Sequence, residues 1–284
     1  MSLSFYNQVL PIVVLYKQEI SQSLTLISLD KNLEEIGINM DVYVYDNSPI
    51  RQYDKDSFQW NNFHVFYFHD PENSGLSKAY NAGAVKAAEL KKEWILLLDQ
   101  DTTFASGYLQ ENNLSVLNHP DINLFAPILK LKNSVIFSPC IAKHKRGYPP
   151  GRLVHGQYSL YDFSPVNSGM LIRLAMFHRV DGYNEKVKID FCDFQFLEKF
   201  RLLSDSFYLI NAVALQDFSN FEPSAAKQKV RFTQYLEDAY HCDKPSVSDK
   251  IGFLYAVTRH AVGLTVKMKN ISFMSMYFSN YLIR

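Results

Sequence analysis

Apolar runs alternate with segments of helical spacing through the first half of the chain. The runs predict buried strands, because strands covered on both faces are almost continuously apolar. These strands are residues 9–16, 41–46, 63–68 and 94–98. Between the first two, apolar residues recur at helical spacing over residues 19–36, and Gly37 supplies a C-terminal cap.

The same alternation continues to about residue 130. A turn at residues 73–75 opens a helix that runs to residue 90, another helix extends to about residue 117, and a strand follows at residues 123–126. Four strand–helix repeats predict a doubly wound α/β sheet with right-handed crossovers. Ligands bind such sheets beyond the carboxyl ends of the strands. Polar residues follow three of the predicted strands there: Tyr16 and Lys17, Asp46 and Asn47, and Asp99 to Asp101.

The second half of the chain has a different pattern. Residues 146–152 form a loop by composition, either a mobile loop facing a site or a plain surface connection. A turn and strand follow at residues 166–172, and a helix at residues 190–201. The last predicted strand is residues 207–215. Helices are then expected around residues 231–241, 249–266 and 272–283.

Composition excludes several classes of protein. The 284 residues, 47% of them hydrophobic, are enough for a large core, and 29 basic residues balance 29 acidic ones. This balance argues against a nucleic-acid partner. The three cysteines form no CxxC pair, so we expect neither a disulfide framework nor a zinc site, and a cytoplasmic location. Neither a signal-peptide pattern nor a long apolar span is present.

The triplet Asp99-Gln100-Asp101 is the strongest candidate for chemistry. Two carboxylates at the end of a buried strand can turn toward one ligand, and such oxygen ligands suit Mg²⁺ or Mn²⁺ bridging a diphosphate. A bound cation would neutralise a diphosphate leaving group. The alternative is a pair of solvated turn acids.

Three other motifs leave two interpretations open. Asp46 could bind a ribose hydroxyl or base edge, or it could cap the turn that follows. The glycine turn at residues 73–75 could offer free backbone N–H groups to an anion at a helix N-terminus. Asp190 and Asp193 share a helix face, where one could act as a general base or both could serve the helix N-terminus.

Together these motifs resemble family 2 glycosyltransferases of the GT-A fold, most closely the rhamnosyltransferase-like branch. Residues 96–102 look like that branch's LLLDQD[ST] segment, and residues 73–83 resemble its glycine turn and helix. Residues 167–169 look like its SG-containing strand, and residues 180–193 resemble its VGxFDE…FIDxVD segment. The resemblance implies a Rossmann-like mixed sheet flanked by helices, with a C-terminal helical extension.

The resemblance also implies a role for each matching residue. Asp193 would be the general base and Asp190 a supporting acid. The donor-binding residues would be Tyr16, Asp46, Asn73, Gly75, Asn81, Asp99 and Gln100. The metal ligands would be Asp99, Asp101 and Asp217, the last of which stands where the family often has a His. The acceptor-binding residues would be Asn167, Ser168 and Gly169.

The implied reaction is transfer of a sugar with inversion, dependent on Mg²⁺ or Mn²⁺, to a glycan or lipid-linked acceptor in surface polysaccharide synthesis. The resemblance favours a dTDP-rhamnose donor, with a UDP-sugar as the alternative. A non-catalytic nucleotide-sugar-binding protein is the third hypothesis. Residues 1–220 would form the catalytic domain, with a nucleotide-binding half (1–130) and an acceptor-binding half (131–220). Residues 221–284 would form the helical extension.

The C-terminal segment, residues 267–284, mixes apolar and basic residues. One interpretation is contact with the inner face of a membrane that carries a lipid-linked acceptor. The favoured interpretation is a helix packed on the catalytic domain or a homodimer contact, because the basic charge of this segment is modest.

Overall fold

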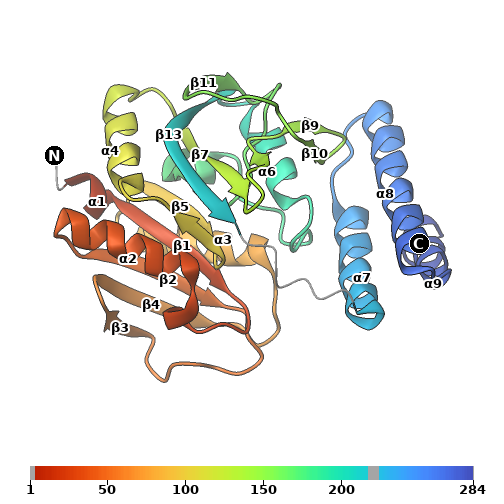
Figure 1. Cartoon of the computed structure of the whole chain (residues 1–284), viewed down its shortest axis with the longest axis horizontal. Helices are drawn as coiled ribbons and strands as arrows, with labels where there is room; N and C mark the ends of the chain where they lie inside the picture. Colours follow the sequence, from red (N-terminus) through yellow and green to blue (C-terminus); the bar gives the residue numbers. More distant parts are fainter. Residues whose placement is uncertain (1–3, 217–223, 284) are drawn as a thin grey trace.

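A computed structural model describes residues 4–216 and 224–283. Among these residues, eleven strands form one sheet, in a main body with helices on both faces of that sheet. The C-terminal helices stand to one side of this body (Figure 1). The molecule is therefore an α/β body with a helical extension.

The first half of the sheet is parallel, as the sequence pattern predicts. Its strands are β1 (Val9–Leu15), β2 (Met40–Asp46), β4 (Phe63–His69) and β5 (Trp94–Asp99). They are ordered β5-β1-β2-β4, so β1 lies in the middle and is buried along its whole length. Its continuous apolar sequence follows from that position.

The second half makes the sheet mixed. The strand β12 (Met170–Arg173) lies antiparallel between β5 and β7 (Leu124–Leu131). The last strand, β13 (Ser206–Gln216), then pairs parallel with β7. This arrangement is the mixed sheet that the family resemblance implies, rather than the wholly parallel sheet that the strand–helix alternation alone suggests.

Several short strands are absent from the sequence prediction. They are β3 (Ser57–Trp60), β6 (Thr102–Phe104), β8 (Ile136–Ser138), β9 (Ile141–Lys143), β10 (Arg146–Tyr148) and β11 (Gly156–Ser159). The strands β9 and β10 form a separate hairpin, so residues 146–152 begin as a strand and are not simply a loop. At three or four residues each, these strands are too short for a clear period-two pattern.

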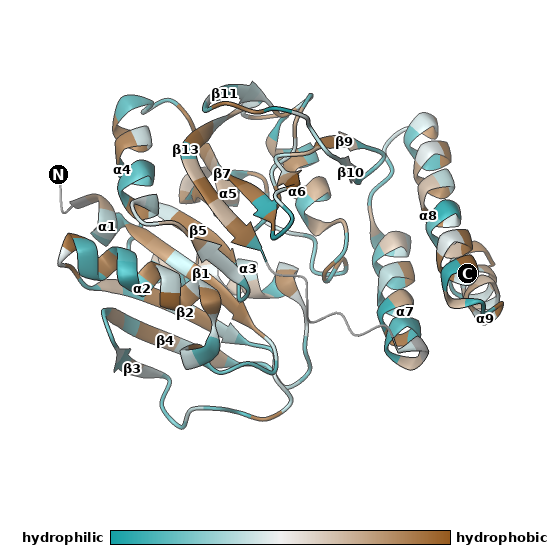
Figure 2. Cartoon of the chain, viewed as in Figure 1, coloured by the Kyte–Doolittle hydropathy of each residue, from teal (hydrophilic) through white to brown (hydrophobic). Residues whose placement is uncertain are grey.

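Helices pack on both faces of the sheet, and each face contributes to its own cluster of buried apolar side chains. The helices α2 (Leu24–Ile36) and α4 (Tyr108–Asn118) pack with one cluster, and α3 (Leu76–Glu89) and α6 (Cys192–Phe200) with the other. Figure 2 shows the hydrophobic residues concentrated in the strands between them. The remaining short helices of the body are α1 (Ser4–Gln8), η1 (Ile20–Gln22) and α5 (Leu174–Arg179).

The extension consists of α7 (Ala225–His241), α8 (Val247–Met268), α9 (Ser272–Tyr277) and η2 (Phe278–Leu282). Phe273 and Tyr277 are buried in the apolar cluster that also contains Phe232 and sheet residues. The C-terminal segment therefore packs mainly on α7 and α8 of the extension, and the expected homodimer contact stays a prediction. Among the described residues, every helix is too short or too polar to cross a membrane.

Candidate functional site

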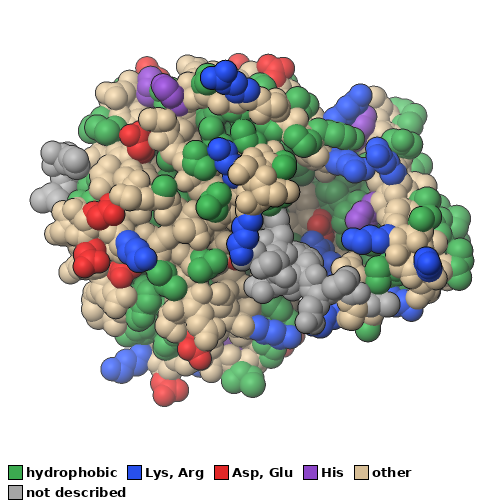
Figure 3. Space-filling view, viewed as in Figure 1, with side chains coloured by type: hydrophobic (Ala, Val, Ile, Leu, Met, Phe, Trp, Pro, Cys, Tyr) green, Lys and Arg blue, Asp and Glu red, His purple; other side chains and the backbone are tan. Residues whose placement is uncertain are grey.

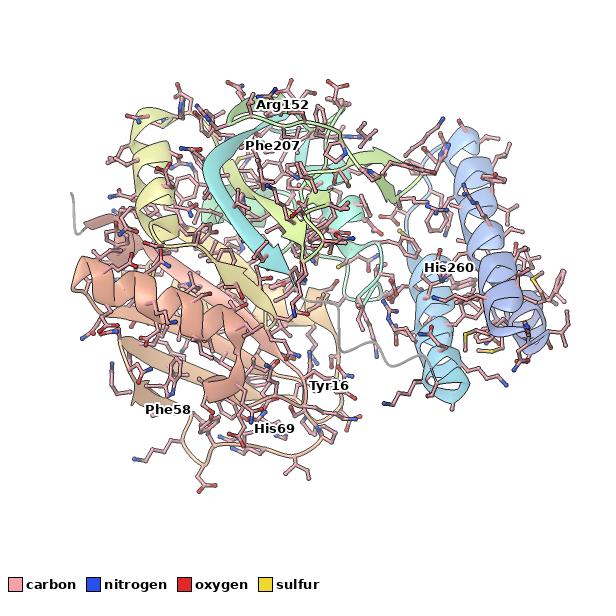
Figure 4. All side chains as sticks on the ribbon, viewed as in Figure 1. Tyr16, Phe58, His69, Arg152, Phe207 and His260 are labelled. Carbon is pink, nitrogen blue, oxygen red and sulfur yellow. The ribbon has the colours of Figure 1, made fainter. Side chains whose placement is uncertain are left out.

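The carboxyl ends of β1, β2 and β5 meet at one edge of the sheet. Leu15 is in register with Asp46, and Val14 with Asp99, so the polar residues that follow these strands gather there. Figure 4 labels Tyr16 and His69 at this edge, which is where doubly wound sheets bind ligands.

Asp99 and Asp101, hereafter the carboxylate pair, are joined by the amide of Gln216 at the end of β13. Its Nε2 donates to Asp99 Oδ2 at 3.1 Å and to Asp101 Oδ1 at 3.2 Å. The Tyr80 hydroxyl donates to the other oxygen of Asp99 at 3.2 Å. The two acids are thus held on one side of the sheet edge and are not splayed into solvent.

The carboxylate pair has the electrostatics of a cation site. Burial, together with the negative charge of Asp101, raises the pKa of Asp99 to about 6. Both effects penalise two adjacent negative charges, and a bound cation would relieve them.

The side chains present also fit a divalent cation. Within residues 4–216 and 224–283 no three His, Cys, Asp or Glu residues converge, so carboxylates alone give two ligands. Gln216 is only 6% exposed, and its Oε1 has no hydrogen-bond partner among the described residues. A half-turn of this amide would present Oε1 as a third oxygen, the ligand type that Mg²⁺ and Mn²⁺ prefer. Asp217, the expected third ligand, lies outside the described residues.

Gln100, between the two acids, links β5 to β1. Its Oε1 accepts from the Tyr16 N–H at 2.8 Å and its Nε2 donates to the Tyr16 carbonyl at 3.4 Å. The Gln100 amide therefore fixes the end of β1, while the Tyr16 ring remains exposed and carries the Lys17 ammonium 4.9 Å from its centroid. Any role of these residues in donor binding remains a prediction.

Asp46 caps the turn after β2, which is one of the two interpretations left open by the sequence. The Ser48 N–H donates to Oδ1 at 2.9 Å and the Tyr67 hydroxyl donates to Oδ2 at 2.6 Å. Its side chain is fully buried. The turn that it shapes borders a groove of about 380 Å³, lined by Lys17, Gln18, Glu19, Gln22, Ser48, Pro49, Ile50 and Gln52.

The N-terminus of α3 does not offer the free N–H groups expected from the glycine turn. The N–H groups of Leu76 and Ser77 donate to the Lys188 carbonyl, at 2.7 and 3.3 Å. Gly75 permits this approach, because a Cβ there would lie 2.6 Å from the same oxygen. The chain itself therefore supplies the acceptor that we expected an anion to provide.

Asn81 and Asn73 also act on the backbone around them. Asn81 donates to the Tyr183 carbonyl at 2.9 Å and accepts from the Tyr183 N–H at 2.9 Å, so its amide holds a turn instead of facing an open pocket. Asn73 takes a left-handed conformation with φ 49° before Gly75, and its N–H donates to the Asp70 carbonyl at 3.2 Å. Both residues shape the region where they were expected to bind a donor.

Asp193 stands in the first turn of α6, which follows Phe191 in a left-handed conformation with φ 67°. Its Oδ1 accepts from the Phe194 N–H at 2.8 Å. Burial, together with the charges of Asp99 and Asp190, raises the pKa of Asp193 to about 7. Asp193 therefore lies close enough to Asp99 for their charges to interact, and it can take up a proton near neutral pH.

The extension holds residues 188–193, hereafter the 188–193 loop. Asp238 on α7 accepts from the N–H groups of Lys188, Ile189 and Asp190, at 2.7, 3.1 and 2.9 Å. Arg231, also on α7, forms a two-pronged ion pair with Asp190. Asp190 is thus paired with an arginine, and the general-base role expected of Asp193 stays a prediction. Figure 3 shows charged side chains around the hollow between the body and the extension.

The segment just before β12 lies next to the carboxylate pair and consists of Asn167, Ser168 and Gly169. The Ser168 hydroxyl accepts from the Asp99 N–H at 3.3 Å, and Asn167 Oδ1 accepts from the Tyr183 hydroxyl at 2.7 Å. Asn167 and Ser168 are buried, so they support the site from below. Their contact with an acceptor stays a prediction.

Four residues of this site are absent from the sequence-based set: Tyr80, Gln216, Arg231 and Asp238. Gln216 ends a predicted strand, so the rule that ligands bind at carboxyl ends could have identified it. Tyr80 lies inside the motif at residues 73–83, on the buried face of its helix. Arg231 and Asp238 have no local signal, because their partners lie 41 and 48 residues away in the chain.

Comparison with known proteins identifies the fold. A model of the family described as glycosyl transferase family 2 matches residues 12–169. A search of curated proteins found no match.

Three solved structures with low sequence identity share the architecture. GalNAc-T7 with UDP, GalNAc and Mn²⁺ has a TM-score of 0.56 and 12% identity over 91% of this chain and 57% of that one. TarS 1–349 from S. aureus with UDP-GlcNAc has 0.51 and 16%, over 96% and 73%. The mannosyltransferase PcManGT from Pyrobaculum calidifontis with GDP-Man and Mn²⁺ has 0.51 and 13%, over 88% and 68%. The fold is therefore GT-A, and this chain spans little more than half the length of GalNAc-T7.

Proposed function

Because the chain belongs to glycosyl transferase family 2, we propose that it transfers a sugar, with inversion, from a nucleoside diphosphate to an acceptor hydroxyl. One observation carries the proposal. Asp99 of the carboxylate pair and Asp193 lie close enough for their charges to interact, yet their surroundings suit them to different roles, cation binding and proton transfer. Such a separation of acid roles by environment is typical of catalytic sites.

The residues would divide the work as follows. Asp99, Asp101 and the Oε1 of Gln216 would hold Mg²⁺ or Mn²⁺, which supplies positive charge to the departing diphosphate. Asp193 would accept the proton of the acceptor hydroxyl as that oxygen attacks the anomeric carbon. The Arg231 guanidinium would hold Asp190 in an ion pair, so that Asp190 would support the loop rather than react.

The nucleotide would lie against the groove at the ends of β1 and β2. Lys17 supplies a cation there for a phosphate, and Gln52 and the Ser48 turn supply hydrogen-bonding groups for a sugar or base. Neither this groove nor a larger one of about 860 Å³ between β4 and α3 is lined by a candidate acid. We favour the smaller groove because Lys17 and Ser48 follow β1 and β2, whose ends lie beside the end of β5 that carries Asp99.

Two donors remain in contention. The Leu-Leu-Leu-Asp-Gln-Asp-Thr segment at residues 96–102 favours dTDP-rhamnose, since that motif resembles the rhamnosyltransferase-like branch. A UDP-sugar is supported by a different observation, namely that GalNAc-T7 and TarS were solved with UDP and UDP-GlcNAc. A non-catalytic nucleotide-sugar-binding protein is the alternative class, and the raised pKa of Asp193 speaks against it.

The acceptor would be a glycan or a lipid-linked glycan, reached from the side of the 188–193 loop. We propose residues 1–220 as the catalytic domain and residues 221–284 as an extension that completes it. Contacts from Arg231 and Asp238 support this arrangement, because they reach into the loop that carries Asp193.

The experiment is a thermal-shift screen of dTDP, UDP and GDP, with and without Mn²⁺, followed by hydrolysis assays on the matching nucleotide sugars. A ligand of the native state raises the melting temperature by mass action. We expect a Mn²⁺-dependent shift, larger for dTDP than for UDP. A larger shift with UDP would select the UDP-sugar alternative, and binding without hydrolysis or transfer would select the non-catalytic one. No shift with any nucleotide would overturn the proposal.

A further inference from the structure

The helix α8 carries an exposed apolar stripe. Val247, Ile251, Tyr255, Val262 and Val266 follow one another at intervals of four or seven residues, so they share one face of the helix. That face is not the one that packs on the molecule, which presents Phe253, Val257 and Ala261. Val247 and Val266 are both 71% exposed, and Tyr255 is 66% exposed.

The stripe continues toward α9. The hydroxyl of Thr258, in the middle of the stripe, lies 2.5 Å from the hydroxyl of Tyr277 on α9, which brings the two helices side by side. The exposed apolar residues beyond this contact are Ile271, Phe278, Leu282 and Ile283. The stripe on α8 and these four residues are together called the outer apolar surface. Apolar residues that are grouped in this way mark an interaction site, whereas single exposed ones do not.

Charge around the outer apolar surface is predominantly positive. Residues 247–284 contain five of the 29 basic residues and one of the 29 acidic ones, Asp249, which leaves 24 basic against 28 acidic residues in the rest of the chain. Lys250 and Arg259 lie on α8 beside the stripe, and Lys267 and Lys269 lie at its end. Figure 3 shows hydrophobic side chains along the outer edge of these helices.

We propose that the outer apolar surface docks on an anionic lipid bilayer, with α8 and α9 lying in the plane of the interface. Apolar side chains flanked by lysine and arginine fit this environment, because the chains enter the lipid boundary while the cations meet lipid phosphates. The fit to a second copy of the chain is poorer. A symmetric dimer brings the same patch against itself, and the one acid among residues 247–283, Asp249, is already engaged in a capping box with Ser246.

Such docking would place the acceptor side of the molecule near the bilayer. The helix α7 lies in the same extension and holds the 188–193 loop through Asp238 and Arg231. If the proposed glycosyl transfer is correct, a lipid-linked acceptor would approach Asp193 from this side. The docking itself needs no turnover, so its test is independent of that function.

The test is co-sedimentation of the full chain with phosphatidylcholine vesicles and with equimolar phosphatidylcholine–phosphatidylglycerol vesicles at low salt. We expect binding to the anionic vesicles only, weakened by added salt. Ile251→Asp should reduce the binding constant about tenfold or more. Lys267→Gln with Lys269→Asn should reduce it about fivefold for each lysine. The asparagine suits the left-handed conformation at residue 269, where φ is 48°.

The matched control is Val85→Asp, which places the same acid at an exposed position on α3 of the main body. It should bind vesicles as the unmodified chain does, and melting temperatures should confirm that all variants fold. A chain that stays in the supernatant with anionic vesicles would overturn the proposal. So would a stable dimer in analytical ultracentrifugation that Ile251→Asp dissociates, because the stripe would then belong to a second copy.

Discussion

The carboxylate pair is held by residues of the main body, whereas the 188–193 loop is held by a helix of the extension. Asp99 ends β5, and its hydrogen-bond partners are Tyr80 on α3, Ser168 just before β12 and Gln216 at the end of β13. The loop that carries Asp193 is instead fixed by Asp238 on α7. The proposed donor side thus depends on the body alone, and the proposed acceptor side depends on the extension as well.

This contrast predicts that variants on the two sides separate transfer from donor binding. The largest effect should come from Asp193→Asn, which keeps the shape of the side chain and removes the proton acceptor. We expect transfer to fall by about 10²–10⁴-fold while nucleotide binding is unchanged. Steady-state transfer assays and calorimetric titration with the nucleotide measure the two properties.

A matched control is Asp249→Asn, at the N-terminal turn of α8, where the aspartate completes a capping box with Ser246. This change should leave transfer intact. Normal turnover by Asp193→Asn would show that another group removes the proton.

The next effect concerns Asp238, the remote residue that supports the loop. Asp238→Asn removes a buried carboxylate that accepts three backbone N–H groups, and we expect a loss of about 2 kcal/mol of unfolding free energy. Transfer should fall more than nucleotide binding, because the loop lies on the acceptor side. Thermal melts with both assays check this, with Glu237→Gln on the same helix as the control. Equal losses of binding and transfer would contradict the separation of the two sides.

A smaller effect is expected on the donor side from Gln216→Leu. The substitution keeps the volume of the side chain but removes the third oxygen near the carboxylate pair, so Mn²⁺ affinity should fall about tenfold, as for one lost ligand contact. Electron paramagnetic resonance of free Mn²⁺ measures it directly. Gln100→Leu, one residue from both acids, is the control, and an equal loss in both variants would exclude Gln216 as a ligand.

The smallest effect is the pH dependence of the metal-free protein. The pKa values of Asp99 and Asp193 in the folded state, about 6 and about 7, lie above the value near 4 of an unfolded aspartate. Between pH 4 and pH 7 the folded state therefore binds more protons, so their contribution to stability is present at low pH and lost as pH rises through this range.

Melting temperatures of the unmodified chain and of Asp193→Asn across this range isolate the contribution of Asp193. As pH rises through this range, the melting temperature of the variant should fall less than that of the unmodified chain. Parallel curves would mean that Asp193 titrates normally. In the presence of Mn²⁺ the share that comes from Asp99 should also decrease, since the cation favours its charged form.

The sequence predicts the donor side well because its geometry follows from strand order. Once β1, β2 and β5 are assigned as parallel neighbours, Asp46 and Asp99 must lie at one edge, whatever the details of the loops. What the sequence could not show is which polar groups are already engaged. Asp46 is enclosed by Ser48 and Tyr67, and the turn before α3 is engaged by Lys188.

The acceptor side is harder to predict because its contacts join segments that share no local pattern. Asp190 and Asp193 look alike in sequence, as two acids on one helix turn. In the structure an arginine pairs with Asp190, while Asp193 remains near other negative charges. The hairpin of β9 and β10 was missed for a related reason, since its three-residue strands pair only with each other.

The three hydrogen bonds that Asp238 accepts from the 188–193 loop have a consequence for folding during synthesis. On a ribosome, the parallel strands β1, β2, β4 and β5 emerge early and can pair while synthesis continues. The 188–193 loop gains its acceptor only after α7 has left the exit tunnel. A nascent chain could therefore form its donor side well before it can react, and a product truncated near residue 220 would lack the group that sets the loop. Under the proposed function, catalytic competence would arrive with a helix that is translated after every strand of the sheet.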